Sequence, residues 1–412
     1  MSPLKIVGFV TCESGGNRAE LEQNYQLRCI LRAKNIVEPF YAMDVLSAAS
    51  KAVRDGHPVI SMATGQPSHK APKRALEAAK SALDIQTMGY TDAVGISSLR
   101  AAISNHYQDY YGVEVSPERI MVTNGSSAAF NLVFLSLFAP GATIAIAKPG
   151  YPAYRNILKA LRLNCVEVQL SAQSNYTLTP EVLEDAERVE GVKIDGVLLA
   201  SPANPTGTVT SEADLRALSD WCEARGTIFI SDEIYHGLTF AGQETTAASF
   251  TDNAVIINSF SKYYCMTGWR IGWMILPEHL IRPIECLAQS MYISAPELSQ
   301  IVAEVALTER DELDQVVDGY RKNRELLLDA LPRVGLPLNS PMDGAFYAYV
   351  DVSSHSNDSM EFSKKMLKDI HVAAVPGLDF DIKDGAKYMR FSYAGSESDI
   401  AEAVDRLEKW LR

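Results

Sequence analysis

The sequence contains six cysteines in 412 residues, and none of them are paired as C-x-x-C. Their scattered positions exclude a zinc-finger-like ligand set and a small domain held together by disulfides. The seven histidines also lack the Cys/His/Asp spacing that is typical of metal ligands, so we predict no metal site. Unpaired cysteines of this kind favour a reducing, cytoplasmic location.

Long apolar runs and long basic runs are missing as well. No stretch approaches the roughly 18–20 consecutive apolar residues that span a bilayer. The 38 basic and 51 acidic residues give a net charge of −13. An acidic chain without a Lys/Arg-rich run is a poor candidate for binding nucleic acid or an anionic membrane, and we expect neither partner.

The sequence has no internal repeat and no low-complexity linker. Its 47% hydrophobic and 22% charged residues are ordinary for a globular protein, and its length suggests two or three domains. Residues 1–35 are predicted to form a loosely attached N-terminal extension.

Downstream of residue 35, short apolar runs alternate with helical patterns, which predicts an α/β fold. Most runs are continuous rather than alternating, as expected for strands of a parallel sheet that are covered on both faces. The predicted strands are 119–123, 143–147, 165–170, 196–200, 227–231, 255–259 and 271–276. Helices are predicted over 126–138, 151–161 and 211–225, and one extended helix over 299–331 could connect two domains. Strands at 345–350 and 388–393, a helix at 360–370 and a closing helix follow.

Lys262 follows directly from an apolar strand and is surrounded by polar residues, in the segment Ser259-Phe-Ser-Lys262 and then Gly268-Trp-Arg270. Taken alone, a lysine is usually a solvated surface charge. Here hydroxyl groups and a guanidinium close to the amine would suit a phosphate dianion. This combination indicates a lysine that forms a Schiff base with a phosphorylated aldehyde.

Two carboxylates, Asp232 and Glu233, end the strand-like run 227–231, and Tyr235 comes soon afterwards. Because side chains alternate along a strand, only one carboxylate is expected to face a pocket. Taken alone, such a pair is more often a helix cap or an exposed pair of charges. The functional alternative is a carboxylate that keeps a heterocyclic nitrogen protonated, with Tyr235 as a hydroxyl donor.

Two further segments follow predicted strands. Ser201-Pro-Ala-Asn204-Pro-Thr-Gly207 forms a rigid turn that can present an amide, and Asn124-Gly-Ser-Ser127 opens a helix whose free N–H groups can bind an anion. Each is weak alone, since turns and serine caps are common. All four segments, however, lie at predicted strand ends.

Together these segments resemble the class I and II aminotransferases of the fold-type-I pyridoxal-phosphate enzymes. The resemblance covers about Val37 to Arg412. Further matching motifs are Gly65-Gln-Pro67, Gly89-Tyr90-Thr91, Pro149-Gly-Tyr-Pro-Ala-Tyr154, Asn204-Pro-Thr-Gly207, Ser231-Asp-Glu-Ile-Tyr235 and Arg390-Phe-Ser392. The resemblance implies a mostly parallel central sheet in a large domain and a smaller α+β domain. We expect residues 36–65 in the small domain, 66–300 in the large cofactor-binding domain, and 301–412 as the connecting helix and the rest of the small domain.

The resemblance also implies roles for individual residues. Lys262 would hold pyridoxal 5'-phosphate and act as base and acid, Asp232 would pair with its ring nitrogen, and Asn204 and Tyr235 would bind its phenolic oxygen. Tyr151 would stack on the ring. The phosphate would be bound by Ser126, Ser127, Ser259 and Arg270, with Ser261 a weaker candidate. Tyr90 would reach the site of the neighbouring subunit, which implies a homodimer.

For the substrate, the resemblance assigns Arg390 to the α-carboxylate, Asn204 beside it and Gly65 to a backbone contact. Ser127 stands where some members that act on acidic substrates carry a basic residue, and the segment 289–296 is mostly apolar or neutral. We therefore expect a neutral amino donor rather than aspartate, although other members take the cation for an acidic substrate from the partner subunit. Phe40 and Tyr41 would line the side-chain pocket or belong to the core, and the aromatic run Phe346-Tyr-Ala-Tyr349 is interpreted as core. His236 is interpreted as structural.

Two alternatives to an aminotransferase stay open at this point. A β-lyase or cyclase on the same scaffold would keep Lys262 and Asp232. A regulatory protein could use the fold only to sense the cofactor, although such a protein usually carries a DNA-binding domain that this sequence does not offer.

Overall fold

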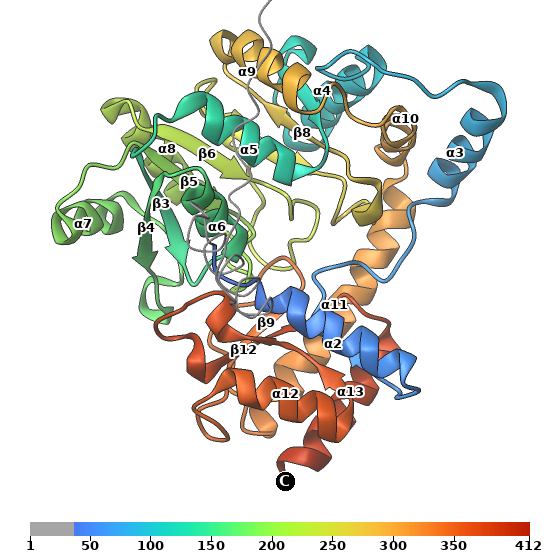
Figure 1. The fold of residues 1–412 in the computed structure, drawn as a ribbon, viewed down its shortest axis with the longest axis vertical. Coiled ribbons are helices and arrows are strands. Elements are labelled where there is room, and N and C mark those ends of the chain that lie inside the picture. The colour runs from blue at the N-terminus through green and yellow to red at the C-terminus, as the bar shows by residue number, and fades with distance from the viewer. Residues whose placement is uncertain (1–36) are drawn as a thin grey trace, which may run out of the picture. The chain divides into compact units, whose positions relative to one another are not determined.

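A seven-stranded sheet lies in the upper half of Figure 1, and the continuous apolar runs of the sequence supply its strands. The computed structural model describes residues 37–412, and the predicted extension over residues 1–35 lies outside them. The strands are β2 (Ile120–Thr123), β3 (Thr143–Lys148), β4 (Asn164–Gln169), β5 (Gly196–Ala200), β6 (Ile228–Asp232), β7 (Val255–Ser259) and β8 (Gly272–Ile275).

The sheet has the strand order β2-β8-β7-β6-β5-β3-β4. β8 runs antiparallel to both of its neighbours, and the other pairs are parallel. The predicted α/β fold with a mostly parallel central sheet is therefore confirmed. The functional loops of β5, β6 and β7 leave the same edge of the sheet, because these strands point in the same direction.

Helices cover both faces of this sheet, which explains why its strands are apolar on both sides. One face packs against α5 (Ser126–Leu137), α6 (Pro152–Ala160) and α9 (Glu278–Met291). The other face packs against α4 (Ser97–Tyr111), α7 (Pro180–Glu190) and α8 (Glu212–Arg225). The helix α3 (Lys73–Ile85) packs against α10 (Glu297–Ala306).

The prediction of one extended helix over 299–331 is wrong. Two helices occupy this stretch, α10 and α11 (Arg310–Arg333), with a break at residues 307–309. The amides of Thr308 and Glu309 bond three residues back, to Val305 and Ala306, and the Thr308 hydroxyl also donates to the Val305 carbonyl at 2.8 Å. This tight turn ends α10, and the ion pair of Glu309 with Arg74 of α3 (2.6 Å) fixes the break.

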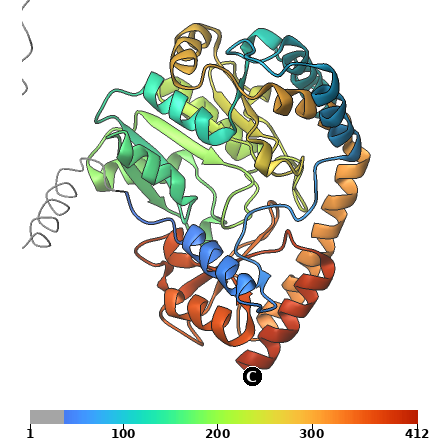
Figure 2. The ribbon, with the colours of Figure 1, turned by 45° about the vertical axis from the view of Figure 1, so that its right-hand side comes forward.

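The remaining elements come from both ends of the described chain. A three-stranded antiparallel sheet has the order β11 (Val375–Pro376), β12 (Tyr388–Ser392) and β9 (Tyr347–Asp351), and β1 (Ile60–Ser61) pairs with β10 (Val372–Ala373). The helices α2 (Tyr41–Arg54), α12 (Ser359–Ile370) and α13 (Glu397–Leu411) surround these strands (Figures 1 and 2). The domain boundaries at residues 65/66 and 300/301 stay a prediction.

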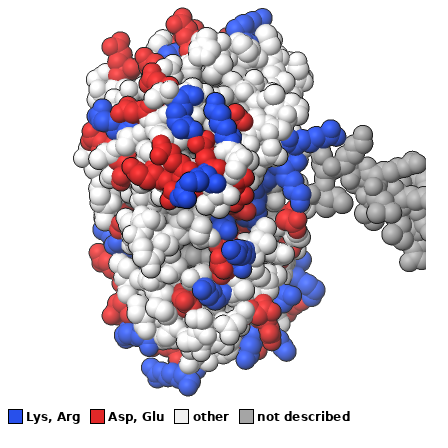
Figure 3. Space-filling view, turned by 90° about the vertical axis from the view of Figure 1, so that its left-hand side faces the viewer, with Lys and Arg blue, Asp and Glu red and all other residues white. Residues whose placement is uncertain are grey.

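The surface carries charges of both signs. On the face shown in Figure 3, acidic and basic side chains of the described residues lie interspersed. Within residues 37–412, no helix combines the length and apolar character that a membrane span requires. The cytoplasmic location stays a prediction.

Candidate active site

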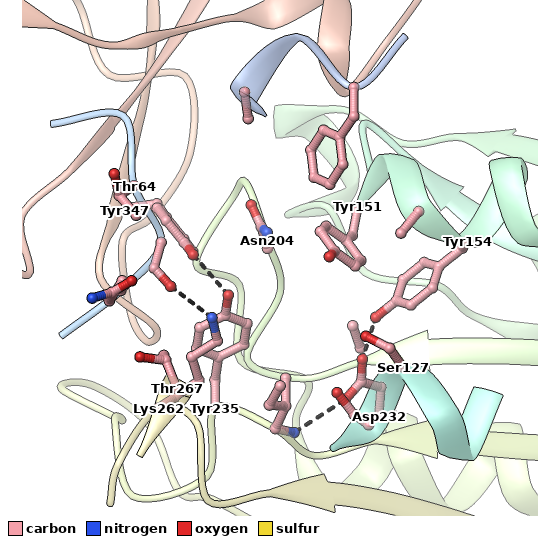
Figure 4. A pocket seen from close by; sticks show the side chains of 18 of the residues that line it. Thr64, Ser127, Tyr151, Tyr154, Asn204, Asp232, Tyr235, Lys262, Thr267 and Tyr347 are labelled. Atoms are coloured by element: carbon pink, nitrogen blue, oxygen red, sulfur yellow. Dashed lines mark hydrogen bonds between the residues drawn. The ribbon is translucent and has the colours of Figure 1, made fainter. Parts of the chain in front are cut away.

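A cavity of about 320 Å³ opens at the carboxyl edge of the central sheet (Figure 4). The last residues of β5 and β6, Ala200 and Asp232, lie in its wall. The loops that follow β5 and β7 bring in Asn204 and Lys262. Parallel strands thus collect side chains from distant parts of the sequence at one site.

Ten of the predicted site residues line this cavity: Phe40, Gly65, Ser126, Ser127, Tyr151, Asn204, Asp232, Tyr235, Lys262 and Arg390. Tyr41 does not line it, and neither do Ser259, Ser261, Arg270 and Tyr90. The Ser259 hydroxyl is instead bonded to Ser261 (2.9 Å) and to the Ile271 carbonyl (3.1 Å) beneath the site. Tyr90 is 83% exposed on the surface.

Lys262 extends into the cavity, where its Nζ donates a hydrogen bond of 2.6 Å to the Gly65 carbonyl. Burial and the Arg390 guanidinium lower the pKa of Lys262 to about 8. An amine with this pKa is partly neutral near physiological pH, so it can act as a nucleophile and as a base.

Asp232 is buried and accepts hydrogen bonds from the Tyr154 hydroxyl and from the Ile234 amide, the latter at 3.1 Å (Figure 4). Burial raises the pKa of Asp232 to about 6. Among the described residues, no basic side chain forms an ion pair with it. Its neighbour Glu233 does not line the cavity and is bound by Thr246 and Ala247 instead.

Arg390 is 4% exposed and lies between two aromatic rings, 4.3 Å from the ring centre of Tyr347 and 4.8 Å from that of Phe380. It donates to the Asn204 side-chain oxygen (2.9 Å) and to the Ala63 carbonyl (2.7 Å), while its buried Nε has no hydrogen-bond partner among the described residues. Within residues 37–412, no carboxylate pairs with this guanidinium. A buried cation in this state is prepared for an anionic ligand.

The start of helix α5 forms the other end of the cavity, with Ser126 and Ser127 in its wall. Gly125 precedes it with φ of 75°, and a β-carbon there would lie 2.7 Å from Nη2 of Arg270. A side chain at position 125 would therefore push the Arg270 guanidinium away from the helix start, and the positive φ also favours glycine. This combination of helix N-terminus, hydroxyls and guanidinium is typical of phosphate sites.

Two tyrosines of the cavity have no predicted role in the sequence. Tyr154 contacts Asp232, and Tyr347 bonds the Tyr235 hydroxyl at 2.7 Å through its own hydroxyl. Tyr154 lies in the first turn of α6 and Tyr151 is the N-cap residue of that helix, with their ring centres 5.2 Å apart, so the closeness of Tyr154 to Tyr151 in the sequence is the signal that could have identified it. The interpretation of residues 346–349 as core is confirmed, since all four are buried, and Tyr347 also lines the cavity.

Comparisons with known proteins agree with this geometry. The profile of the family described as aminotransferase class I and II matches residues 57–407. A relative from Mycobacterium tuberculosis named valine–pyruvate aminotransferase is 44% identical over 388 residues, which are 93% of this chain and 98% of the relative.

Solved structures show the same likeness. One described as an aminotransferase from Mycobacterium tuberculosis matches with a TM-score of 0.88 and 44% identity, over 91% of this chain and 97% of that chain. A single mutant of the aspartate aminotransferase of Thermus thermophilus matches with a TM-score of 0.83 and 28% identity, over 90% and 97% of the two chains. The profile match and the 44% identity across nearly the whole length show that the chain belongs to the class I and II aminotransferases, a pyridoxal-phosphate-dependent family.

Proposed function

We propose that this aminotransferase moves the amino group of an amino acid with a neutral, apolar side chain to a 2-oxo acid. The observation that carries this proposal is the composition of the cavity wall. Among the described residues that line it, the basic side chains are those of Lys262 and Arg390, and much of the remaining wall is apolar: Phe40, Met43, Leu46, Phe130 and Ile157. The name of the 44% identical relative, valine–pyruvate aminotransferase, agrees with such a donor.

The residues present fit pyridoxal phosphate. Asp232 is a buried carboxylate without a basic partner in the described chain, which suits a protonated ring nitrogen. Lys262 offers a partly neutral amine for the aldehyde, and the start of α5 with Arg270 suits the phosphate. We assign the covalent link to Lys262, ring stacking to Tyr151, and the phosphate to Ser126, Ser127, Ser259 and Arg270.

When bound, the cofactor supplies an electron sink for the charge that develops as the substrate loses its α-proton. Lys262 would take this proton and return it at the other end of the transfer. Asn204 and Tyr235 would orient the ring through its phenolic oxygen, and the bond from Tyr347 fixes the Tyr235 hydroxyl. Cofactor and substrate bound in the cavity would displace water from around Lys262, which would favour proton transfer over hydrolysis.

Arg390 would bind the α-carboxylate common to all amino-acid substrates, beside Asn204 and the backbone of Gly65. The side chain of the substrate would then contact the apolar part of the wall. We also propose a homodimer in which the exposed Tyr90 reaches the neighbouring site. No observation favours the β-lyase or cyclase alternative over transamination.

The substitution Arg390→Lys is expected to lower kcat/KM for every amino acid by about 10- to 150-fold. Lysine cannot reproduce the charge-assisted bidentate hydrogen bond of the guanidinium. The expected loss corresponds to about 1.5–3 kcal/mol of binding free energy in the transition state. The measurement compares alanine, leucine, phenylalanine, aspartate and glutamate on wild type and variant. A loss confined to aspartate and glutamate would refute the α-carboxylate role.

The substitution Tyr154→Phe is expected to lower kcat at pH 7 by about tenfold with little change in KM, because a hydrogen bond to a charged group is lost. This bond lowers the pKa of Asp232, so its removal favours the protonated carboxyl. The acidic limb of the kcat profile should therefore move to higher pH. Tyr393→Phe is the matched control, because this tyrosine is buried and its hydroxyl has no hydrogen-bond partner in the described part of the chain. An unchanged pH profile in Tyr154→Phe would contradict the role of Tyr154.

The donor preference is tested on the wild-type holoenzyme with one 2-oxo acid acceptor. We expect valine and leucine to exceed aspartate and glutamate in kcat/KM. A strong preference for aspartate would overturn the neutral-donor proposal and would indicate a cation from outside the described residues or from a partner subunit.

A further inference from the structure

We propose that Asp379 is a positioning residue that anchors helix α2 over the cavity and thereby sets the preference for bulky apolar side chains over alanine. This inference rests on the proposed function, because it assumes that an apolar substrate side chain contacts α2. It assigns specificity to a carboxylate that does not line the cavity.

Helix α2 has two apolar sides with different contacts. Val45 and Ala49 pack with residues of the three-stranded sheet, and Ala42 packs there and also lines the cavity. Met43 and Leu46 line the cavity. Phe40, just before the helix, packs edge-on against Tyr151, with the two ring centres 5.8 Å apart. The position of α2 on the three-stranded sheet therefore determines the position of the apolar wall of the cavity.

The first turn of α2 has no capping side chain of its own, since Phe40 occupies the N-cap position. Asp379 supplies the missing acceptors from a distant part of the sequence. Its Oδ1 accepts the Tyr41 amide at 2.9 Å, and its Oδ2 accepts the Ala42 amide at 3.1 Å. The first amides of a helix lack intrahelical partners, so a carboxylate at this place holds the helix start in position.

Asp379 is itself fixed from the opposite wall. It is fully buried, and its backbone carbonyl accepts a bond of 2.7 Å from Arg155 of α6. The next carbonyl, that of Phe380, accepts the Gly150 amide at 3.1 Å. Because α6 also lines the cavity, one turn of the chain connects the two walls between which the substrate side chain would lie.

The same turn also supports Arg390, whose guanidinium lies over the Phe380 ring. A disturbance that reached the substrate through Arg390 would weaken all amino acids equally, since all carry the α-carboxylate. A displacement of α2 would instead weaken valine and leucine more than alanine, whose methyl group reaches the wall least. Side-chain dependence therefore separates the two routes.

The test uses the full-length holoenzyme and the variants Asp379→Ala and Asp379→Asn. In Asp379→Ala we expect the ratio of kcat/KM for valine to that for alanine to fall at least fivefold, mainly through KM. Amide hydrogen exchange in residues 41–46 should accelerate at least tenfold. Asp379→Asn keeps one acceptor oxygen and should retain more of the ratio.

Asp358→Ala is the matched control. Asp358 accepts the amides of Met360 and Glu361, both at 3.0 Å, at the start of α12, which does not line the cavity. This variant should leave the valine-to-alanine ratio and the exchange of α2 unchanged.

Equal losses for valine and alanine, or unchanged exchange in α2, would overturn the inference. If Asp379→Ala does not fold, Asp379→Asn is the test of the inference. Asparagine has only one acceptor oxygen for two amides, so hydrogen exchange of the Tyr41 or the Ala42 amide must still accelerate. A wild-type preference for aspartate would refute the proposed function instead, whereas the exchange data test the anchor without any substrate.

Discussion

Turnover is expected to fall by at least about 10³-fold in Lys262→Ala, while the protein stays folded and still binds the cofactor weakly. The amine supplies two things that alanine cannot, the covalent link and the proton transfer, and general base catalysis alone contributes about 10²- to 10⁴-fold. The measurement is kcat with saturating cofactor, together with the melting temperature of the variant.

The control for this substitution is Lys80→Ala, at an exposed lysine of α3, which should leave kcat unchanged. Activity close to wild type in a cofactor-saturated Lys262→Ala preparation would contradict the catalytic assignment. Borohydride reduction of the wild-type holoenzyme followed by peptide mapping should place the pyridoxyl group on Lys262.

The second large effect is expected for Asp232→Ala, with kcat reduced by about 10²- to 10³-fold, the range measured for removal of one preorganised electrostatic group. The carboxylate matters most as charge develops on the ring, so kcat should suffer more than substrate KM. Glu233→Gln is the neighbouring control, since Glu233 is equally buried but does not line the cavity. If kcat survives and only cofactor affinity drops, Asp232 is a binding residue.

The same carboxylate should make the apoprotein less stable as the pH rises. The pKa of Asp232 is about 6 in the folded protein, above the ordinary value of 3.8, so the folded state binds more protons between these values. Relative to Asp232→Ala, the free energy of unfolding of wild-type apoprotein should therefore fall by about 3 kcal/mol between pH 3.5 and pH 7. A difference that does not change with pH would contradict the burial of an uncompensated carboxylate.

Many strands of this fold can be predicted from the local sequence pattern. Runs such as 196–200 and 255–259 are continuous and apolar because helices cover both faces of their strands, and the observed strands β5 and β7 have these same bounds. The break at Thr308 was not predictable in this way. The residues around it continue a helical pattern, and the turn is fixed by contacts with α3, which lies more than 200 residues earlier.

The residues of the candidate site also fall into two groups, those that the sequence predicts and those that only the structure shows. Lys262 and Asp232 could be identified from the sequence, because a charged residue next to a buried apolar strand is costly unless it has a partner or a function. The sequence gives no such signal for Tyr154, Tyr347 and Asp379. Tyrosine is also common in hydrophobic cores and aspartate is common in turns. Their partners are 78, 112 and more than 330 residues away, so only the folded chain shows what they contact.

The most direct test of the account is a half-reaction, in which the holoenzyme is mixed with valine in the absence of any 2-oxo acid. Transamination predicts one equivalent of the oxo acid of valine per active site, no free ammonia, and a cofactor left in its aminated form until pyruvate is added. Aspartate under the same conditions should react more slowly. Release of ammonia, repeated turnover without an acceptor, or an oxo acid formed from aspartate but not from valine would contradict the account.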